Sequence, residues 1–165
     1  MSFNYDPLLS YDENRGHYLR NYHQEVGHLV EKLISKYDPD PEAKHLGTGG
    51  KVDYVNSTYC FEQKINPATD NSSSRKANLL KGKEYAKSHG LEFVYAYLED
   101  RGKNMYVKDG VLHVHGSAIF ELLGISDKWH TFLTELENEK QAIVNRLRQE
   151  FDKRFGSYKL QGKAI

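Results

Sequence analysis

The sequence has a single cysteine, Cys60, among its 165 residues. One cysteine excludes an internal disulfide and a cysteine-rich zinc site, and it favours a reducing, intracellular compartment. No partner with the spacing of a cysteine–histidine active site accompanies Cys60, so we expect a small packed residue. The chain also lacks an apolar run of the ~18–20 residues that a membrane span needs, and its first residues do not resemble a signal peptide. These absences predict a cytoplasmic, intracellular protein without a membrane partner.

A net charge is also absent, because 23 basic residues balance 23 acidic ones. Neutrality argues against a protein that binds nucleic acid by electrostatics alone. The charges are unevenly placed, however. Residues 1–62 carry ten acids and six bases, whereas residues 64–87 carry six bases and two acids. A basic segment beside an acidic one suits a metal site that cleaves phosphodiesters, although neutral proteins often show such imbalance.

What the sequence does contain fits one domain over residues 1–165, with 38% hydrophobic and 28% charged residues. The spacing of apolar residues and of turn residues predicts helices, strands and one hairpin. The expected helices are 12–37, 72–89, 117–125 and 127–155, the expected strands are 51–56, 57–65 and 91–100, and the expected hairpin is 105–116. We expect Ser117 to cap the third helix and Gly124 to end it. This order indicates an α/β or α+β domain with a central mixed β-sheet flanked by helices.

Asp53, Glu62 and Lys64 form the most informative constellation. If segments 51–56 and 57–65 pair as an antiparallel hairpin, Asp53 and Glu62 approach each other across it. Glu62 and Lys64 then share one face, because strand side chains alternate, and Phe61 points to the other face. Two adjacent carboxylates repel unless a cation lies between them, and Mg²⁺ prefers oxygen ligands. A nearby lysine can position a water and stabilise charge on a phosphate.

Asp53, followed nine residues later by Glu62-Gln63-Lys64, resembles the PD-(D/E)XK nuclease motif, and the surrounding sequence resembles type II restriction endonucleases. The acid-x-lysine half is intact, whereas Val52 stands where the family often has proline. The resemblance covers residues 51–64 closely and residues 25–99 through the order of elements. It implies a restriction-endonuclease-like core and Mg²⁺-dependent, sequence-specific cleavage of double-stranded DNA by a homodimer. It also implies a cognate DNA methyltransferase that acts on the same site.

In nucleases of this kind the first helix often adds another acid, and Glu25 is the candidate here. Its spacing from Tyr18, Tyr22 and Leu29 places it on the apolar face of the helix. A buried carboxylate is costly unless it is paired or bound to a metal, so Glu25 is expected either in the catalytic cluster or in an ion pair. Glu31 lies about 120° away around the helix and is expected to be solvated.

The segment that follows the motif is polar and precedes the second expected helix. Hydroxyl groups, amides and main-chain N–H groups at a helix start are good partners for phosphate. We therefore expect DNA contacts from six residues, and the alternative is an ordinary helix cap after a solvated loop. These residues are Asn71, Ser72, Ser73, Ser74, Arg75 and Lys76.

His113 and His115 alternate on an expected strand, yet two ligands do not make a zinc site. The pair is instead a candidate for the lining of a DNA cleft. The last expected helix has a long apolar stripe that either completes the core or forms a dimer interface.

Three functions remain open from the sequence. The first is a Mg²⁺-dependent type II restriction enzyme in which Asp53 and Glu62 bind metal, Lys64 positions the water and Glu25 adds an acid. The second is a junction-resolving, repair or homing nuclease with the same core. The third is a non-catalytic DNA-binding or interaction domain whose acids and lysine are merely solvated.

Overall fold

A computed structural model describes residues 11–47, 49–65 and 72–155 of the protein. Four α-helices, a 3-10 turn and six strands follow one another in this part of the chain. Their bounds are α1 Tyr11–Tyr37, β1 Lys44–His45, β2 Tyr54–Val55, β3 Tyr59–Lys64, α2 Ser72–His89, β4 Glu92–Tyr97, β5 Met105–Lys108, β6 Val111–His115, α3 Ala118–Leu122, η2 Ser126–Lys128 and α4 Trp129–Phe155. None of these helices is both long enough and apolar enough to cross a membrane.

The chain divides into two compact units, and α1 contributes residues to both. The sheet unit is Val30–Leu133. The helical unit combines Met1–Leu29 with Thr134–Ile165, and its described part is 11–29 and 134–155. A single domain over residues 1–165 stays a prediction.

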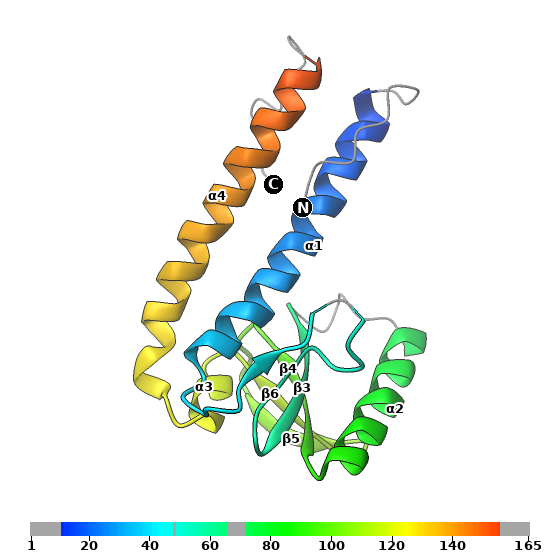
Figure 1. Ribbon diagram of the computed structural model, residues 1–165, viewed down its shortest axis with the longest axis vertical. Coiled ribbons are helices and arrows are strands. Elements are labelled where there is room, and N and C mark those ends of the chain that lie inside the picture. Colours follow the sequence, from blue (N-terminus) through cyan, green and yellow to red (C-terminus); the bar gives the residue numbers. More distant parts are fainter. Residues whose placement is uncertain (1–10, 48, 66–71, 156–165) are drawn as a thin grey trace. The chain divides into compact units, whose positions relative to one another are not determined.

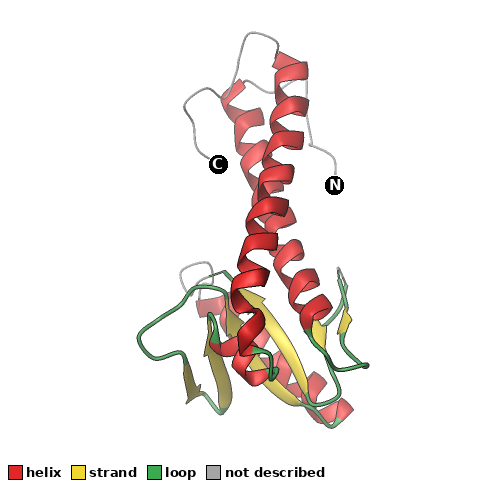
Figure 2. Cartoon of the chain, turned by 90° about the vertical axis from the view of Figure 1, so that its left-hand side faces the viewer, coloured by secondary structure: helices red, strands yellow, loops and turns green. Residues whose placement is uncertain are grey.

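The sheet unit is built on one six-stranded mixed sheet with the strand order β1-β2-β3-β4-β6-β5. Figure 1 labels β3, β4, β5 and β6 of this sheet. Strands β1, β2 and β3 form an antiparallel meander, and β3, β4 and β6 run parallel. Strand β5 returns antiparallel to β6. Figure 2 draws these strands in yellow and the helices in red. The predicted α/β class with a mixed sheet is confirmed.

Helix α2 connects β3 to the parallel strand β4, a connection that needs a crossover of this length. The helix predicted over 72–89 is confirmed, and it ends where Gly90 adopts a φ of 67°. Glycine favours this left-handed conformation after a helix. Within the helix, a Cβ atom at Gly82 would lie 2.1 Å from the Phe93 ring. The missing side chain therefore lets α2 pack directly on β4.

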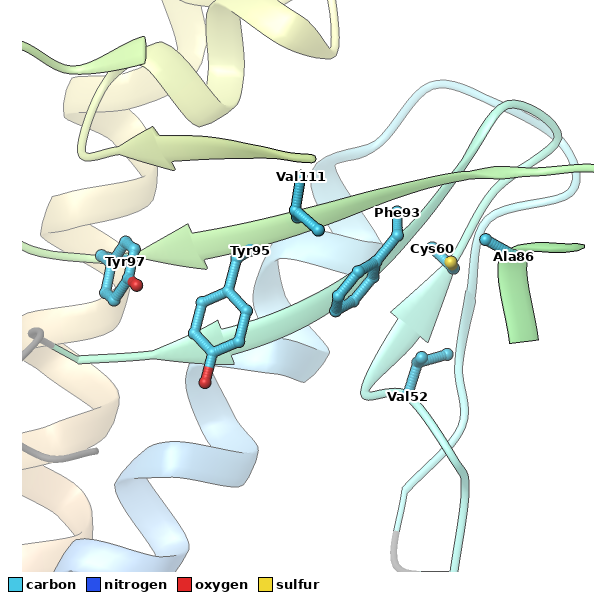
Figure 3. Packing of buried hydrophobic residues seen from close by; sticks show 7 residues of the cluster. All are labelled: Val52, Cys60, Ala86, Phe93, Tyr95, Tyr97 and Val111. Atoms are coloured by element: carbon cyan, nitrogen blue, oxygen red, sulfur yellow. The ribbon is translucent and has the colours of Figure 1, made fainter. Parts of the chain in front are cut away.

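Side chains from the sheet and α2 form a buried cluster that Figure 3 shows from close by. Its members are Val52, Cys60, Ala86, Phe93, Tyr95, Tyr97 and Val111. Cys60 is fully buried, and burial raises the pKa of its thiol to about 12. The expectation that Cys60 is a packed residue is confirmed.

The hairpin that carries the motif is more irregular than its sequence predicts. Only Tyr54 and Val55 of the segment 51–56 form a strand, although they pair antiparallel with β3 as expected. Strand β1 was not predicted, because two residues are too few to show a periodicity. It pairs with β2 and extends the sheet by one strand.

Two short turns join antiparallel strands, one between β2 and β3 and one between β5 and β6. At the first, the side-chain oxygen of Asn56 accepts hydrogen bonds from the main-chain N–H groups of Thr58 and Tyr59, at 2.9 and 2.7 Å. At the second, Asp109 and Gly110 have φ angles of 55° and 72°. Two consecutive positive φ angles are typical of a tight two-residue hairpin turn. The predicted hairpin over 105–116 is confirmed.

Helix α3 follows β6 and is shorter than the predicted 117–125. Ser117 occupies the predicted cap position, but its side chain makes no capping hydrogen bond. Its main-chain N–H instead donates to Asp100 Oδ1 at 3.2 Å. Gly124 lies beyond the helix with a φ of 75°, as expected for a helix end.

Aromatic rings at the start of α4 complete a second part of the sheet unit's core. Trp129 and Phe132 contact Phe120 of α3, with ring centroids 5.2 and 4.9 Å apart. Tyr37, the last residue of α1, meets the Phe132 ring edge-on at 5.9 Å. The first part of the apolar stripe on α4 is therefore a core element of this chain.

In the helical unit, residues 11–29 of α1 run antiparallel to residues 134–155 of α4. Tyr18 packs against Phe151 with ring centroids 5.5 Å apart, and Glu25 pairs with Arg146. Both Tyr18 and Phe151 are fully buried. A homodimer through α4 stays a prediction.

Candidate active site

Glu62 and Lys64 lie near the carboxyl end of β3, a central strand of the sheet. Strand β3 pairs with β4 through all six of its residues, which fixes its backbone. Alternation along the strand places both side chains on one face. Lys64 Nζ lies 3.5 Å from Glu62 Oε1, and the two side chains are 24% and 12% exposed. A paired acid and base therefore remain partly open to solvent.

Asp53 reaches the same place from the other side of the hairpin. Tyr54 faces Phe61 in the strand register, so Asp53 and Glu62 occupy the next opposed positions. The Asp53 N–H donates to the Phe61 carbonyl at 2.9 Å, and Asp53 Oδ2 accepts from the Gln63 N–H at 2.7 Å. These two bonds hold the Asp53 carboxylate beside the motif strand.

Gln63 anchors the opposite face of the strand. Its side-chain oxygen accepts a 2.7 Å hydrogen bond from the Tyr54 hydroxyl, and its amide donates to the Lys64 carbonyl at 3.1 Å. Tyr54 also stacks on Phe61 with ring centroids 4.5 Å apart. Phe61 is fully buried, as the sequence predicts. The buried side of β3 thus fixes which way Glu62 and Lys64 point.

Glu31 of α1 is the third acid of this cluster, and the expectation that it is solvated is wrong. Only 8% of its surface is exposed, because Val30, Leu33 and Ile34 around it all pack inward. Glu31 hydrogen-bonds to Asp53 and lies close to Glu62. Burial, followed by the negative charge of Asp53, raises the pKa of Glu31 to about 9. Near neutral pH, this carboxyl group therefore holds a proton.

His45 of β1 also contacts Glu31. Its Nε2 atom lies 3.4 Å from Glu31 Oε2, and both side chains are largely buried. Glu31 thus has both Asp53 and His45 as neighbours. The sequence did not single out His45, because β1 itself was not predicted.

Glu25, the acid predicted for the cluster, lies in the helical unit. Its carboxylate forms an ion pair with Arg146 of α4, and its side chain is 9% exposed. Of the alternatives open from the sequence, the structure shows the ion pair. The structure brings together Asp53, Glu62 and Lys64, and it adds Glu31.

The charge of the cluster suits a divalent cation. Three carboxyl groups, from Glu31, Asp53 and Glu62, converge near one lysine. One ammonium group cannot neutralise three carboxylates, and the pKa of Glu31 is raised first by burial and then by its negative neighbours Asp53 and Glu62. Oxygen donors of this kind are the ligands that Mg²⁺ prefers, and a bound cation would replace the proton on Glu31. The residues therefore fit Mg²⁺.

The residues predicted to contact DNA lie around the start of α2. Asn71 is outside the described residues, and Ser72 begins the helix. Ser73, Ser74 and Lys76 are exposed, whereas Arg75 is half-buried. DNA contact by this segment stays a prediction.

His113 and His115 do not line an open cleft, because they are 2% and 0% exposed. Tyr106 stacks on the His113 ring at 5.2 Å, and its hydroxyl lies 2.9 Å from His115 Nε2. Burial lowers the pKa of both histidines, so they are neutral at physiological pH. They belong to a packed aromatic layer.

Comparisons with known proteins do not assign a function, so the geometry of the site is the basis for one. The chain matches no protein-family model, no curated protein and no solved structure.

Proposed function

We propose that the protein is a Mg²⁺-dependent endonuclease that hydrolyses phosphodiester bonds in double-stranded DNA. The observation that carries this proposal is the convergence of Asp53, Glu62 and Lys64 on the β2–β3 hairpin, with Glu31 of α1 beside them. The order α1, antiparallel β1 to β3, α2 and parallel β4 agrees with the PD-(D/E)XK core that the motif resembles. Site-specific cleavage by a type II restriction enzyme is the first candidate within this class.

Each residue has a role that follows from its position. Glu31, Asp53 and Glu62 would hold the cation, which supplies a Lewis acid for the phosphate and lowers the pKa of a bound water. The Lys64 ammonium group donates hydrogen bonds, so it orients the attacking water and stabilises the negative charge that develops on the phosphate. Gln63 and Tyr54 act as positioning residues, because they fix the strand from its buried face.

The test is cleavage of plasmid and phage DNA by the purified protein, with Mg²⁺ and with EDTA. We expect discrete fragments with Mg²⁺ and none with EDTA. Glu62→Gln and Lys64→Ala should each reduce cleavage by at least about 100-fold, which is the typical cost of losing a charge-stabilising group. Glu84→Gln and Lys87→Ala, at exposed positions of α2, are the matched controls and should cut normally.

The other outcomes separate the alternatives. Cleavage of branched DNA alone would indicate a junction-resolving nuclease with the same core. DNA binding without cleavage, unchanged in both variants, would contradict the enzyme. Circular dichroism should show that Glu62→Gln and Lys64→Ala remain folded. Loss of structure in either variant would instead assign that residue a structural role.

A further inference from the structure

A second charged surface lies at the far side of the sheet, around the edge strand β5. It is an open depression of about 560 Å³ lined by Arg101, Gly102, Lys103, Tyr106, Val107 and Lys108. Three of these six residues are cations and none is an acid. We call Arg101, Lys103 and Lys108 the β5 basic surface. All three are exposed.

Part of this surface follows β4, whose carboxyl end lies beside the candidate active site because Tyr97 pairs with Lys64. Strands β3 and β4 run parallel, so they end at the same edge of the sheet. Their pairing continues past the strand ends, because the Leu98 N–H donates to the Lys64 carbonyl at 2.9 Å and the Glu99 N–H donates to the Ile65 carbonyl at 2.9 Å. Arg101 follows two residues later. Ligands of open α/β sheets commonly bind at the carboxyl ends of the strands.

The loop that carries Arg101 and Lys103 is held in place by its own hydrogen bonds. Its turn is closed by the Arg101 N–H, which donates to Asn104 Oδ1 at 2.7 Å. Asp100 Oδ1 accepts from the Ser117 N–H at 3.2 Å and lies so close to Gly116 that a Cβ atom there would be 1.8 Å away. Asp100, the acid that directly precedes Arg101, is therefore engaged in the turn.

The three cations themselves are uncommitted within the described residues, where none of them forms an ion pair with a carboxylate. Tyr106 between them is fixed by its contact with His115. A guanidinium group matches the geometry of a phosphate, and lysine supplies point charges. The β5 basic surface thus has the chemistry of a phosphate-binding surface.

We propose that the β5 basic surface binds backbone phosphates of the duplex DNA whose scissile bond lies at Glu62 and Lys64. This inference rests on the proposed function. It adds a DNA contact that lies outside both the nuclease motif and the predicted DNA-contacting segment at the start of α2. The competing explanation is protection of an edge strand, because lysines on an exposed edge prevent pairing with other chains. Strand β5 is such an edge, and its Val107 is 72% exposed.

The experiment measures duplex DNA binding by fluorescence anisotropy in the Glu62→Gln background, over a range of salt concentrations. The triple variant Arg101→Ala, Lys103→Ala and Lys108→Ala should bind at least about tenfold more weakly at ~100 mM salt. Its dependence of log K on log salt should be shallower by about 2–3, since each phosphate contact contributes about 0.9. The variant Arg101→Lys, Lys103→Arg and Lys108→Arg should retain binding.

The control removes three other exposed lysines of the sheet unit, through Lys51→Ala, Lys87→Ala and Lys128→Ala. Equal loss in both triple variants would overturn the inference, since net charge alone would then explain binding. Unchanged DNA binding, with or without self-association on size exclusion, would overturn it in favour of edge protection. Cleavage and binding by the native chain separate failure of this inference from failure of the proposed function. If the native chain neither cuts nor binds DNA, the proposed function fails as well.

Discussion

Glu31 shows how strongly one side chain can depend on its neighbours. It is an ordinary glutamate in sequence, but the fold buries it beside Asp53 and near Glu62. Burial and negative neighbours both disfavour its charged form. The folded chain therefore keeps a proton that the unfolded chain releases, and this difference links folding to pH.

The sign of that linkage gives a prediction for stability. The pKa of Glu31 is about 9 in the folded protein against 4.5 for the free group. Between these values the folded state binds more protons than the unfolded state, so the free energy of unfolding falls as pH rises. Glu31→Gln removes this loss, and it should stabilise the metal-free protein near pH ~8 by about 1–3 kcal/mol, equivalent to one or two pKa units of about 1.4 kcal/mol each.

Thermal unfolding at several pH values checks this prediction. The gain should shrink as pH falls and disappear below pH ~4.5, where Glu31 becomes protonated in the unfolded chain as well. Adding Mg²⁺ should stabilise the native chain at the higher pH and stabilise the variant much less, because the variant lacks a ligand. A variant less stable than the native chain at high pH would contradict the assigned environment of Glu31.

At the scale of elements, α2 was predictable to the residue and the motif hairpin was not. Serines at 72–74 and Gly90 are local signals that bound a helix. Strand β1 and the bends before Tyr54 depend on pairing between neighbouring strands, which the short pattern of either strand does not encode.

The same distinction applies to two acids of α1, Glu25 and Glu31. Spacing from Tyr18, Tyr22 and Leu29 correctly placed Glu25 towards a neighbouring element, but that element is α4 with Arg146. Further along α1, Val30, Leu33 and Ile34 are buried, and Glu31 is buried among them. The apolar residues Val30, Leu33 and Ile34 around Glu31 were the feature of the sequence that could have predicted its burial.

The contact between α2 and β4 gives a second prediction. Gly82→Ala places a methyl group where the Phe93 ring now lies. Although alanine favours a helix by about 1 kcal/mol, overpacking should dominate and destabilise the protein by about 1–3 kcal/mol. Chemical denaturation measures the change, and Phe93→Leu in the same chain should recover part of the loss.

Gly27→Ala in α1 is the matched control for this substitution. No atom lies within 4 Å of a Cβ at Gly27, so only helix propensity changes and stability should rise by up to about 1 kcal/mol. Equal effects at the two glycines would mean that α2 does not pack on Phe93 as described.

At the scale of the whole molecule, the helical unit joins the two ends of the described chain. Glu25 and Arg146 are 121 residues apart in sequence, and their ion pair lies between two antiparallel helices. The charges balance over the chain as a whole, while three acids of the sheet unit meet at the candidate site and three of its cations line the depression at β5. The net charge of zero therefore hides the separate acidic and basic clusters that the proposed function needs.

The two glutamates of α1 supply a third prediction. Glu25→Gln should lower stability by about 1 kcal/mol through loss of a partly exposed ion pair, with cleavage within about threefold of the native rate. Glu31→Gln should reduce cleavage by at least about 100-fold, because it removes a proposed metal ligand. Paired plasmid-cleavage and unfolding assays measure both effects, and the opposite pattern would place Glu25 in the catalytic cluster.

The single cysteine, finally, allows local opening of the protein to be measured through the reactivity of its thiol. Cys60 is fully buried two residues before Glu62, and its thiol with a pKa of about 12 is unreactive in the closed state. Alkylation therefore proceeds only through transient openings of β3, so its rate measures the opening free energy of the strand that carries the motif. Because no other thiol is present, this readout needs no mutation and no added label.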